Sequence, residues 1–476
     1  MAKKSILLLI FVIFGCAAKS PRKPNNEGSQ VEINLSSKIK SFSLAPVGIS
    51  LNQINESAFP LNKLKEALKN SGVKYLRFPE GESADNYLWS VPPYEKSNGR
   101  VSQTHLWPAN DPLLVKNDAT FKQGLDFDGF TEILKDVGAE ANIVLCYPCG
   151  DKVKSLELAK QWVRYANITK KLGIKNWELG NETYLKNYLG PALPVQEYAK
   201  DLIQFSSELK KIDPTIRIGA NGEKPMWWRE LFAYRDTNTG KSVADSIDFV
   251  VFHNYPLGGS TQLYEDYLSK TDLTGSLKEL KKIIQEHAPK LTIAVTETNA
   301  LSFKGADENN LGSAIIVFDI IGQLLIDPKV EYVQLWTSHW VKNKFSNNLQ
   351  NAFDLNNEPL PIGKALGIWG TNLKSSLVKA VSTDSDLKTY ASYSESDKNI
   401  TIFLINPRKD SKEVSVSIAA QKKDFSDGQL IVFSGNDVND MNPKFSDPIN
   451  IKAQANSFSL TLRPTSISII NLKTAN

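Results

Sequence analysis

The chain has few of the residues that build disulfide scaffolds and transition-metal sites. Among its 476 residues there are only three cysteines and four histidines. Disulfide-stapled domains need many more cysteines, and zinc sites need clustered cysteine and histidine ligands. We therefore expect neither a disulfide scaffold nor a metal site, and the chemistry suggested below needs no cofactor.

An excess of charge of one sign is also lacking. The 56 Lys and Arg residues stand against 52 Asp and Glu residues, a formal net charge of +4, which gives no indication of a nucleic-acid partner. No repeat of fixed period is present, which argues against solenoids and propellers. No glycine-rich phosphate loop follows the first β-rich run at residues 44–51, so a dinucleotide-binding fold is disfavoured as well.

The chain lacks any hydrophobic run long enough to span a bilayer. The N-terminal run at residues 6–14 has nine apolar residues, with Lys3 and Lys4 before it and Gly15-Cys16 after it. A charged start and a short apolar run are typical of an export signal. Residues 13–16 resemble a bacterial lipobox, so we expect residues 1–15 to be a signal peptide, Cys16 to carry the lipid and residues 16–30 to tether the protein to the cell envelope. The alternative is ordinary secretion, with cleavage after residue 17 or 18.

Short β-rich runs alternate with helix-like stretches along most of the chain. The β-rich runs lie at residues 44–51, 74–78, 141–146, 176–180, 216–220, 247–253, 292–296 and 332–336. The helix-like stretches between them include residues 61–70, 130–137, 156–172, 194–212, 276–287 and 310–326. Eight such runs alternating with helices predict the α/β class, with a (β/α)8 TIM barrel over residues 43–370.

The pattern changes in the last part of the chain, residues 371–476. Alternating, Ser/Thr-rich strands at residues 388–394, 399–405, 413–419, 429–433 and 457–472 predict an all-β sandwich. The strand-like residues 31–42 are expected to pair with it. Because this segment has few aromatic residues outside its strands, we expect it to support the barrel rather than to bind carbohydrate.

Two carboxylates end strands of the predicted barrel. Glu182 closes the fourth strand and Glu297 closes the seventh, and active sites of such barrels lie at the C-terminal ends of the strands. Glycoside hydrolysis needs one carboxyl group to protonate the leaving oxygen and a second to attack the anomeric carbon or activate water. The sequence therefore favours a glycosidase over two alternatives, a glycan-binding lipoprotein without catalysis and a membrane-anchored structural protein.

The residues around these carboxylates resemble those of the clan A retaining glycoside hydrolases. An Asn-Glu pair ends strand four and a Glu ends strand seven, and residues 75–81, 162–167 and 177–182 are most similar to the α-L-arabinofuranosidases. Enzymes of the β-xylosidase and β-glucuronidase/heparanase kinds share this plan. The resemblance implies a plant or algal polysaccharide, or its oligosaccharides, as substrate. It leaves open a xyloside, glucuronide or galactan, the linkage and anomeric configuration, exo or endo action, and the oligomeric state.

The resemblance implies a role for each residue that matches the clan pattern. Glu182 would be the acid/base and Glu297 the nucleophile. Asn181 would bind the sugar hydroxyl next to the anomeric centre, Arg77 would keep the nucleophile ionised, and Tyr255 would donate a hydrogen bond to Glu297.

Further residues are expected around this pair. Glu178 is expected to point into the barrel and hydrogen-bond the site, His253 either lines the site or is a core histidine, and Trp336 would be a platform for a sugar ring. Other residues in loops on the same face suggest an extended cleft: Trp89, Trp107, Trp227, Trp228, His339 and Trp340.

Two features depart from the arabinofuranosidase pattern. Glu80 and Glu82 follow Pro79, where small residues are usual, and a carboxylate here would bind sugar hydroxyls or repel an anionic substrate. Cys146 and Cys149 flank a Tyr-Pro pair at the end of the third strand, where they form either a short-range disulfide or two structural thiols.

Overall fold

The computed structural model describes residues 28–56, 61–87, 89, 125–147, 152–185, 192–304, 308–340, 349–420 and 424–474. Within these residues, eight parallel strands close into a barrel, which confirms the predicted fold class. In chain order they are β2 (Val47–Ser50), β3 (Tyr75–Phe78), β4 (Glu140–Leu145), β5 (Asn176–Leu179), β6 (Arg217–Asn221), β7 (Phe249–Asn254), β8 (Thr292–Thr298) and β9 (Val330–Leu335).

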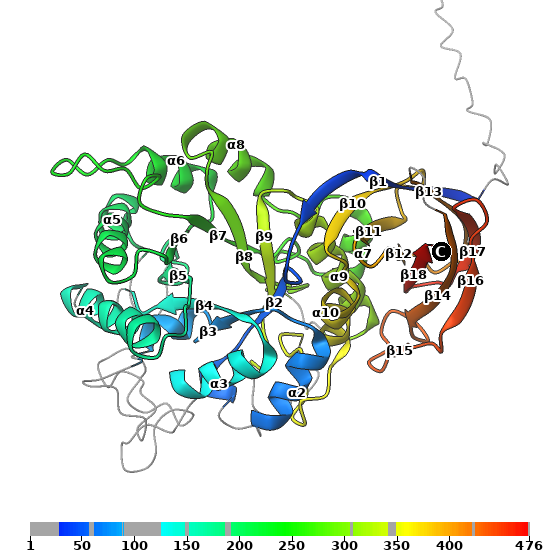
Figure 1. Cartoon of the computed structure of the whole chain (residues 1–476), viewed down its shortest axis with the longest axis horizontal. Coiled ribbons are helices and arrows are strands. Elements are labelled where there is room, and N and C mark those ends of the chain that lie inside the picture. Colours follow the sequence, from blue (N-terminus) through cyan, green and yellow to red (C-terminus); the bar gives the residue numbers. More distant parts are fainter. Residues whose placement is uncertain are drawn as a thin grey trace, which may run out of the picture.

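Helices surround this barrel on the left of Figure 1. They are α1 (Gln53–Glu56), α2 (Leu61–Ser71), α3 (Phe127–Val137), α4 (Lys152–Val163) with a following π turn (Arg164–Thr169), α5 (Val195–Ile212), α6 (Pro225–Ala233), α7 (Leu263–Ser269), α8 (Leu277–His287), α9 (Leu311–Leu325) and α10 (Pro361–Asn372). A 3-10 turn (Glu82–Asn86) follows β3. No helix in the described part of the chain combines the length and apolar character needed to cross a bilayer.

Local sequence signals explain where the well-defined helices begin and end. The Asp126 side chain accepts a hydrogen bond from the backbone N–H of Gly129 at the start of α3, and Gly138 ends that helix in a left-handed conformation. Asn310 caps α9 in the same way, through the N–H of Ser313. The helices that begin and end in this way cover the barrel strands. The residues of these strands are almost all buried, as expected where both faces of a parallel sheet are covered.

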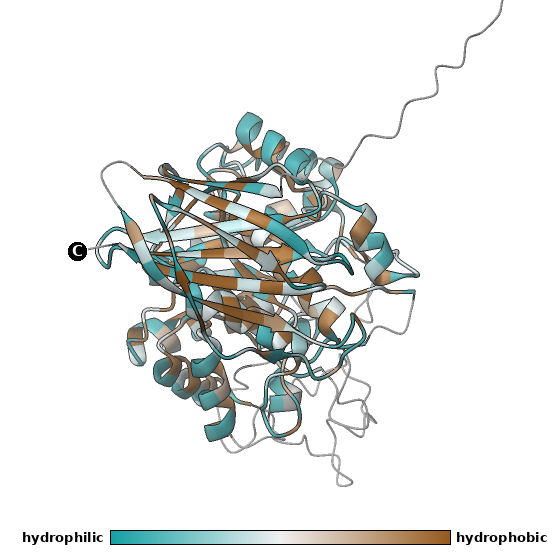
Figure 2. Ribbon diagram, turned by 90° about the vertical axis from the view of Figure 1, so that its right-hand side faces the viewer, coloured by the Kyte–Doolittle hydropathy of each residue, from teal (hydrophilic) through white to brown (hydrophobic). Residues whose placement is uncertain are grey.

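The second unit is a ten-stranded mixed sheet on the right of Figure 1, seen face-on in Figure 2. Its strands are β1 (Ser29–Ser41), β10 (Ser376–Ser382), β11 (Lys388–Ser394), β12 (Asn399–Asn406), β13 (Lys412–Ala419), β14 (Phe425–Ser434), β15 (Lys444–Phe445), β16 (Ile449–Lys452), β17 (Ser457–Leu462) and β18 (Ser466–Thr474). We call this unit the β-domain. Inward-facing aliphatic side chains from both halves of the sheet form its core.

The β-domain differs in two ways from the predicted sandwich. The expected pair of sheets is one continuous sheet, because β1 pairs with β10 on one side and with β13 on the other and so joins the two halves. The expected single strand at residues 457–472 is two strands, β17 and β18, which pair with different partners. The chain turns between them where Thr465 adopts a positive φ of 42°.

Helices α9 and α10 join the two units. All residues of α9 except Gln323 are buried, because the barrel covers one side of the helix and the β-domain covers the other. Phe318 of α9 stacks on Trp369 of α10 at 4.5 Å between ring centroids, and Trp369 lies 4.7 Å from Phe403 of β12. This shared apolar core fixes the β-domain to the outside of the barrel, away from the strand ends that carry the polar site described next.

Candidate active site

A pocket of about 400 Å³ lies at the C-terminal ends of the barrel strands. Its lining brings together residues from the ends of six different strands and from the loops that follow them. They are Glu82, Asn181, Glu182, Tyr184, Leu185, Glu223, His253, Tyr255, Glu297, Leu301, Phe303, Trp336, Trp340 and Gln350. Six of these were not expected from the sequence: Tyr184, Leu185, Glu223, Leu301, Phe303 and Gln350.

Glu182 and Glu297 face one another across this pocket. One carboxylate oxygen of each, together with a ring nitrogen of His253, lies within 4.8 Å of the others. Glu182 has a positive φ of 43° and follows Gly180, whose φ is 72°. A Cβ on residue 180 would come within 2.6 Å of the Tyr147 carbonyl oxygen, so only glycine allows the tight turn that aims Glu182 at Glu297.

Glu297 is held by two strong donors. Nη1 of Arg77 lies 2.6 Å from its Oε1, and the Tyr255 hydroxyl donates to its Oε2 at 2.8 Å. Burial raises the pKa of Glu297, and the positive charges of His253 and Arg77 limit that rise. Both donors favour the ionised carboxylate, which is the form able to act as a nucleophile.

Glu182 has a different environment. His253 Nδ1 lies 2.8 Å from its Oε1, and the Tyr184 hydroxyl donates to the same oxygen at 3.2 Å. Burial raises the pKa of Glu182, but the hydrogen bond and charge of His253 outweigh burial and bring the pKa below its usual value. The pKa of His253 is itself raised, because the charges of Glu297 and Glu182 outweigh its burial. The two shifts therefore both favour a proton on His253 over a proton on Glu182.

A buried polar layer lies beneath the two carboxylates. Arg77 is fully buried and donates from Nη2 to Glu178 at 2.9 Å and to Asn181 at 2.8 Å, in addition to its contact with Glu297. Asn142 donates to the other oxygen of Glu178. The two negative charges outweigh burial and raise the pKa of Arg77. Arg77 thus holds the carboxylates of Glu178 and Glu297 and the amide of Asn181 in fixed positions relative to one another.

Asp85 positions the loop that carries Asn181 and Glu182. Its Oδ1 accepts the backbone N–H of Asn181 at 3.0 Å, and burial raises its pKa well above the usual range. Sequence reasoning did not identify Asp85, because a lone Asp in a turn after a strand is common.

The remaining expected residues are distributed as follows. Trp336 is 7% exposed and lies against Gly81, where an added Cβ would meet both its ring and Glu297. Trp340 is 37% exposed at the mouth, beside Trp336. His253 lines the pocket and also contacts Thr296 through Nε2. Glu80 is 1% exposed and accepts a hydrogen bond from Asn52, so Glu82 is the carboxylate of this loop that reaches the pocket.

Several aromatic residues expected in an extended cleft lie elsewhere. Trp89 stacks on Trp162 in the barrel core, Trp228 is fully buried, and the buried His339 contacts Glu56 at 3.0 Å. Trp227 packs near Tyr184 and donates to the Asn221 carbonyl oxygen. Large apolar rings fill the core as readily as they line clefts, and sequence position did not separate the two cases.

The cysteine and lipid predictions fall partly outside the described residues. Cys146 is disulfide-bonded, which contradicts two free thiols. Cys149, Cys16 and Trp107 lie outside the described residues.

The Glu182, His253 and Glu297 group has enough donor atoms to bind a metal ion. The Arg77 guanidinium, however, lies 2.6 Å from Glu297. A cation bound to this carboxylate would be repelled by that guanidinium, so the donor set fits proton transfer better than metal binding.

In sequence and in structure, the chain is similar to known glycoside hydrolases. Residues 153–355 match the model of glycosyl hydrolases family 39. The chain is 25% identical over 229 residues to an intracellular exo-α-(1→5)-L-arabinofuranosidase of Acetivibrio thermocellus, an alignment covering 44% of this chain and 41% of the relative. The chain thus spans less than half the length of that curated relative.

Solved structures match over nearly the whole chain. An α-L-arabinofuranosidase from Thermotoga maritima has a TM-score of 0.70 at 22% identity, covering 93% of this chain and 99% of that one. A xyloglucanase from Paenibacillus polymyxa has a TM-score of 0.63 at 14% identity, covering 94% of this chain and 99% of that one. At these identities the structural matches establish a shared fold.

Proposed function

Because the chain is a relative of the clan A glycoside hydrolases and has their barrel, we propose that it is a retaining glycoside hydrolase. The observation that carries the proposal is the approach of the Glu182 and Glu297 oxygens to within 4.8 Å. Retaining enzymes place their carboxyl groups about 5 to 5.5 Å apart, whereas inverting enzymes leave about 6.5 to 9.5 Å for a water molecule. The pair therefore supports double displacement.

In the first step Glu297 attacks the anomeric carbon while the bond to the glycosidic oxygen breaks. Glu182 gives a proton to that oxygen, so the leaving group departs as an alcohol and the sugar becomes an ester of Glu297. Glu182 obtains this proton from Nδ1 of His253, 2.8 Å away. The transfer leaves a neutral imidazole beside a carboxylic acid, with no net change in the charge of the pair.

In the second step the Glu182 carboxylate removes a proton from water. The water oxygen attacks the anomeric carbon, the ester bond breaks and Glu297 leaves as a carboxylate. The sugar is released with its original configuration. Arg77 and Tyr255 stabilise Glu297 both before attack and after release, while Asn181, held by Arg77 and Asp85, is placed to bind the adjacent hydroxyl.

We propose a neutral sugar, best represented by an α-L-arabinofuranoside of a plant or algal polysaccharide or its oligosaccharides. Glu82 and Glu223 add two carboxylates to the catalytic pair, and the pocket lining among the described residues contains no Lys or Arg. Arg77 is fully buried below, and each of its three guanidinium nitrogens already donates to a protein side chain. A uronic acid or sulfated sugar would meet repulsion here without a compensating cation.

A β-linked backbone sugar is the second candidate. One structural neighbour is a bifunctional glucanase-xylanase, with a TM-score of 0.66 and 94% of this chain covered. Phe303, 70% exposed on the pocket wall, and Trp340 offer apolar surface for a sugar beyond the cleaved bond.

The test is sugar release from neutral and anionic aryl glycosides and polysaccharides by the wild type and by Glu182→Ala. We expect neutral arabinofuranosides to react best and uronides not to react. Glu182→Ala should retain far more activity on nitrophenyl glycosides, whose leaving group needs no proton, than on polysaccharides. Equal losses on both substrate types would contradict the acid role. Glycan binding without release by the wild type would favour a non-catalytic binding protein.

We also propose that the protein is exported and lipidated on Cys16, anchored to a bacterial cell envelope. The two lysines, the nine-residue apolar run and the Gly-Cys pair support this proposal. Labelled palmitate should be incorporated by the wild type and by Cys149→Ser but not by Cys16→Ser. Incorporation into Cys16→Ser, or none into the wild type, would contradict it.

A further inference from the structure

A second and larger hollow, of about 540 Å³, lies on the flank of the barrel where it meets the β-domain. It shares no lining residue with the pocket around Glu182 and Glu297. We call it the flank groove. Its lining comes from α2, α10, the turn at residues 353–359 and, in the β-domain, from β14, β15 and β18. It includes Lys63, Glu66, Asn70, Asn357, Glu358, Lys364, Gly367, Ile368, Thr371, Ile431 and Phe445.

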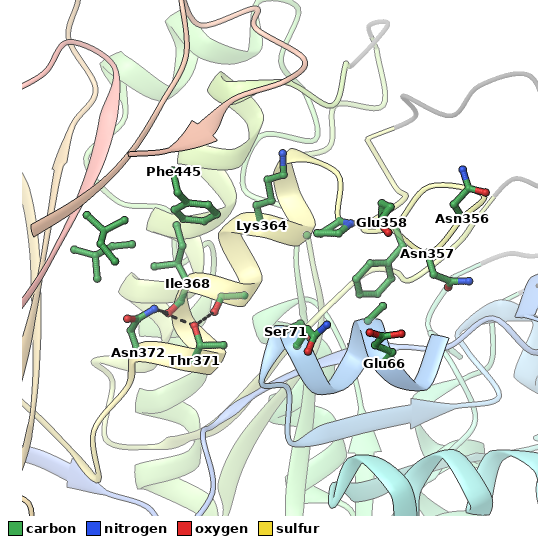
Figure 3. A pocket seen from close by; sticks show the side chains of 18 of the residues that line it. Glu66, Ser71, Asn356, Asn357, Glu358, Lys364, Ile368, Thr371, Asn372 and Phe445 are labelled. Carbon is green, nitrogen blue, oxygen red and sulfur yellow. Dashed lines mark hydrogen bonds between the residues drawn. The ribbon is translucent and has the colours of Figure 1, made fainter. Parts of the chain in front are cut away.

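Polar groups from two helices face this groove. Figure 3 shows α10, with Lys364, Ile368 and Thr371, between Phe445 of the β-domain and α2, which carries Glu66. Two lysines, Lys63 and Lys364, stand against two glutamates, Glu66 and Glu358, so the formal charge of the lining is zero. A groove without net charge has no preference for the phosphates of a nucleic acid or of a lipid headgroup.

An exposed aromatic ring stands at one edge of the groove. Phe445 is 46% exposed and is supported from behind by Phe433, with ring centroids 5.0 Å apart. Ile431, also in the lining, continues the apolar surface. An exposed, supported ring beside hydrogen-bonding side chains can pack against the C–H face of a sugar while its hydroxyl groups are bound at the rim.

The floor of the groove is kept open by Gly367. An added Cβ at this position would meet only the Cα of Ser71 at 3.7 Å, an ordinary contact. Packing therefore does not require glycine here, although glycine in a helix interior costs about 0.5 to 1 kcal/mol relative to alanine. The side chain that is missing is one that would project into the groove.

The turn at one end of the groove contains a buried amide without a partner. Asn357 is 4% exposed, and neither its Nδ2 nor its Oδ1 has a hydrogen-bond partner among the described residues. Such groups are rare in folded proteins because an unpaired buried amide is costly. The same connection between β9 and α10 also carries Trp340 and Gln350 of the catalytic pocket, so one segment reaches both hollows.

We propose that the flank groove is a second carbohydrate-binding site that holds a neutral polysaccharide chain outside the catalytic pocket. The balanced charge, the exposed ring of Phe445, the open floor at Gly367 and the amide of Asn357 carry the inference. The choice of carbohydrate as ligand class rests on the proposed function. Binding here would keep a polymer beside the enzyme between successive cleavages and would add affinity through the second contact.

The test measures binding and hydrolysis separately. Native electrophoresis in gels containing arabinan, arabinoxylan or mixed-linkage glucan measures affinity, and kcat/KM on the best nitrophenyl glycoside reports on the catalytic pocket. Phe445→Ala and Gly367→Leu should weaken retardation by the best polysaccharide about five- to tenfold, roughly 1 to 1.4 kcal/mol. Both should leave kcat/KM on the small substrate unchanged.

Two matched controls accompany these variants. Gly367→Ala adds only the Cβ that the structure accommodates, and Val381→Ala removes an apolar side chain of similar exposure, 48%, from outside the groove. Both should bind as the wild type does. Undiminished retardation of Phe445→Ala and Gly367→Leu, or no retardation of the wild type by any neutral polysaccharide, would overturn the second site. If the wild type fails to hydrolyse any substrate, the proposed function is overturned. The retardation assay would still test whether the flank groove binds polysaccharide.

Discussion

The interior of the barrel and the interior of the β-domain are both shielded from solvent, but they contain different residues. At the C-terminal end of the barrel, Arg77, Glu178 and Asn142 are fully buried and bonded to one another. The core of the β-domain consists almost entirely of aliphatic side chains such as Ile402 and Leu404. Burying charges is a poor way to gain stability, so the contrast indicates that the barrel's buried ions serve the two carboxylates above them.

The largest expected effect is on activity alone. Glu297→Ala should lower kcat/KM by about 10⁴-fold or more, because no other group can form the glycosyl ester. The melting temperature should stay close to that of the wild type, because Arg77 keeps Glu178 as a counter-ion at 2.9 Å when Glu297 is removed. Glu331→Ala is the control, because Glu331 pairs with Arg217 at 2.7 Å away from the site. Substantial activity in Glu297→Ala would remove Glu297 from the mechanism.

Arg77→Met should damage both activity and stability. It leaves Glu178 and Glu297 without their cation, and breaking a buried ion pair from one side costs about 3 to 5 kcal/mol. Ile402→Ala, in the β-domain core, should cost about 2 to 5 kcal/mol through the cavity it leaves. Denaturant unfolding and kinetics together separate the two, since only Arg77→Met should lower kcat/KM of the folded enzyme. An equal loss of kcat/KM in Ile402→Ala would mean that the two interiors are not functionally distinct.

Two tyrosines that donate hydrogen bonds to carboxylates, the half-buried Tyr255 and the buried Tyr390, allow a smaller version of the same comparison. Tyr255 donates to Glu297, whereas Tyr390 donates to Asp319 at the junction between barrel and β-domain. Tyr255→Phe should lower kcat about 10- to 100-fold, by roughly 1.4 to 2.7 kcal/mol. It should also move the acidic limb of the pH profile upward, because removal of this hydrogen bond raises the pKa of Glu297. Tyr390→Phe should lower the melting temperature and leave the pH profile of kcat in place.

The smallest effect concerns stability and pH. The negative charge of Glu56 and the hydrogen bond that His339 donates to it outweigh burial and raise the pKa of His339 above its ordinary 6.5. A pKa raised on folding stabilises the protein fully below the unfolded value, and this contribution is lost as pH rises through the folded value. The melting temperature of the wild type should therefore fall as pH rises above about 6.5, relative to Glu56→Gln. Parallel curves for the two proteins would show that His339 is not charged.

The alternation of β-rich runs and helix-like stretches along the sequence was enough to predict the barrel. All eight strand positions follow from short buried runs separated by helices, because a parallel barrel imposes that alternation. The β-domain was harder. The strand at residues 31–42 was correctly expected to pair with this unit, but its place between β10 and β13, which joins the two halves into one sheet, was not predicted. Pairing between strands more than 300 residues apart leaves no local signal of strand order. The division of residues 457–472 into two strands depends on the turn at Pro464 and Thr465. Proline is a usual turn residue and interrupts strands, so Pro464 was the available signal that the prediction of one strand overlooked.

The sequence was enough to locate Glu182 and Glu297, the two proposed reacting residues. It was not enough to predict which other residues lie around them. Glu182 and Glu297 end predicted strands, so their convergence follows from the barrel. Which of two nearby glutamates, Glu80 or Glu82, reaches the pocket depends on one backbone turn, where Glu80 takes a φ of 115°. Tyr184 and Phe303 lie in loops, where neither hydrophobic periodicity nor residue propensity predicts which way a side chain points.

The most direct test of the central claim is the configuration of the first sugar released. Proton NMR of the best substrate, recorded within the first turnovers and before mutarotation, distinguishes the two anomers. Double displacement through Glu297 predicts a product with the same anomeric configuration as the substrate. An inverted product would require a water molecule between Glu182 and Glu297, and would contradict the mechanism built on their approach to within 4.8 Å.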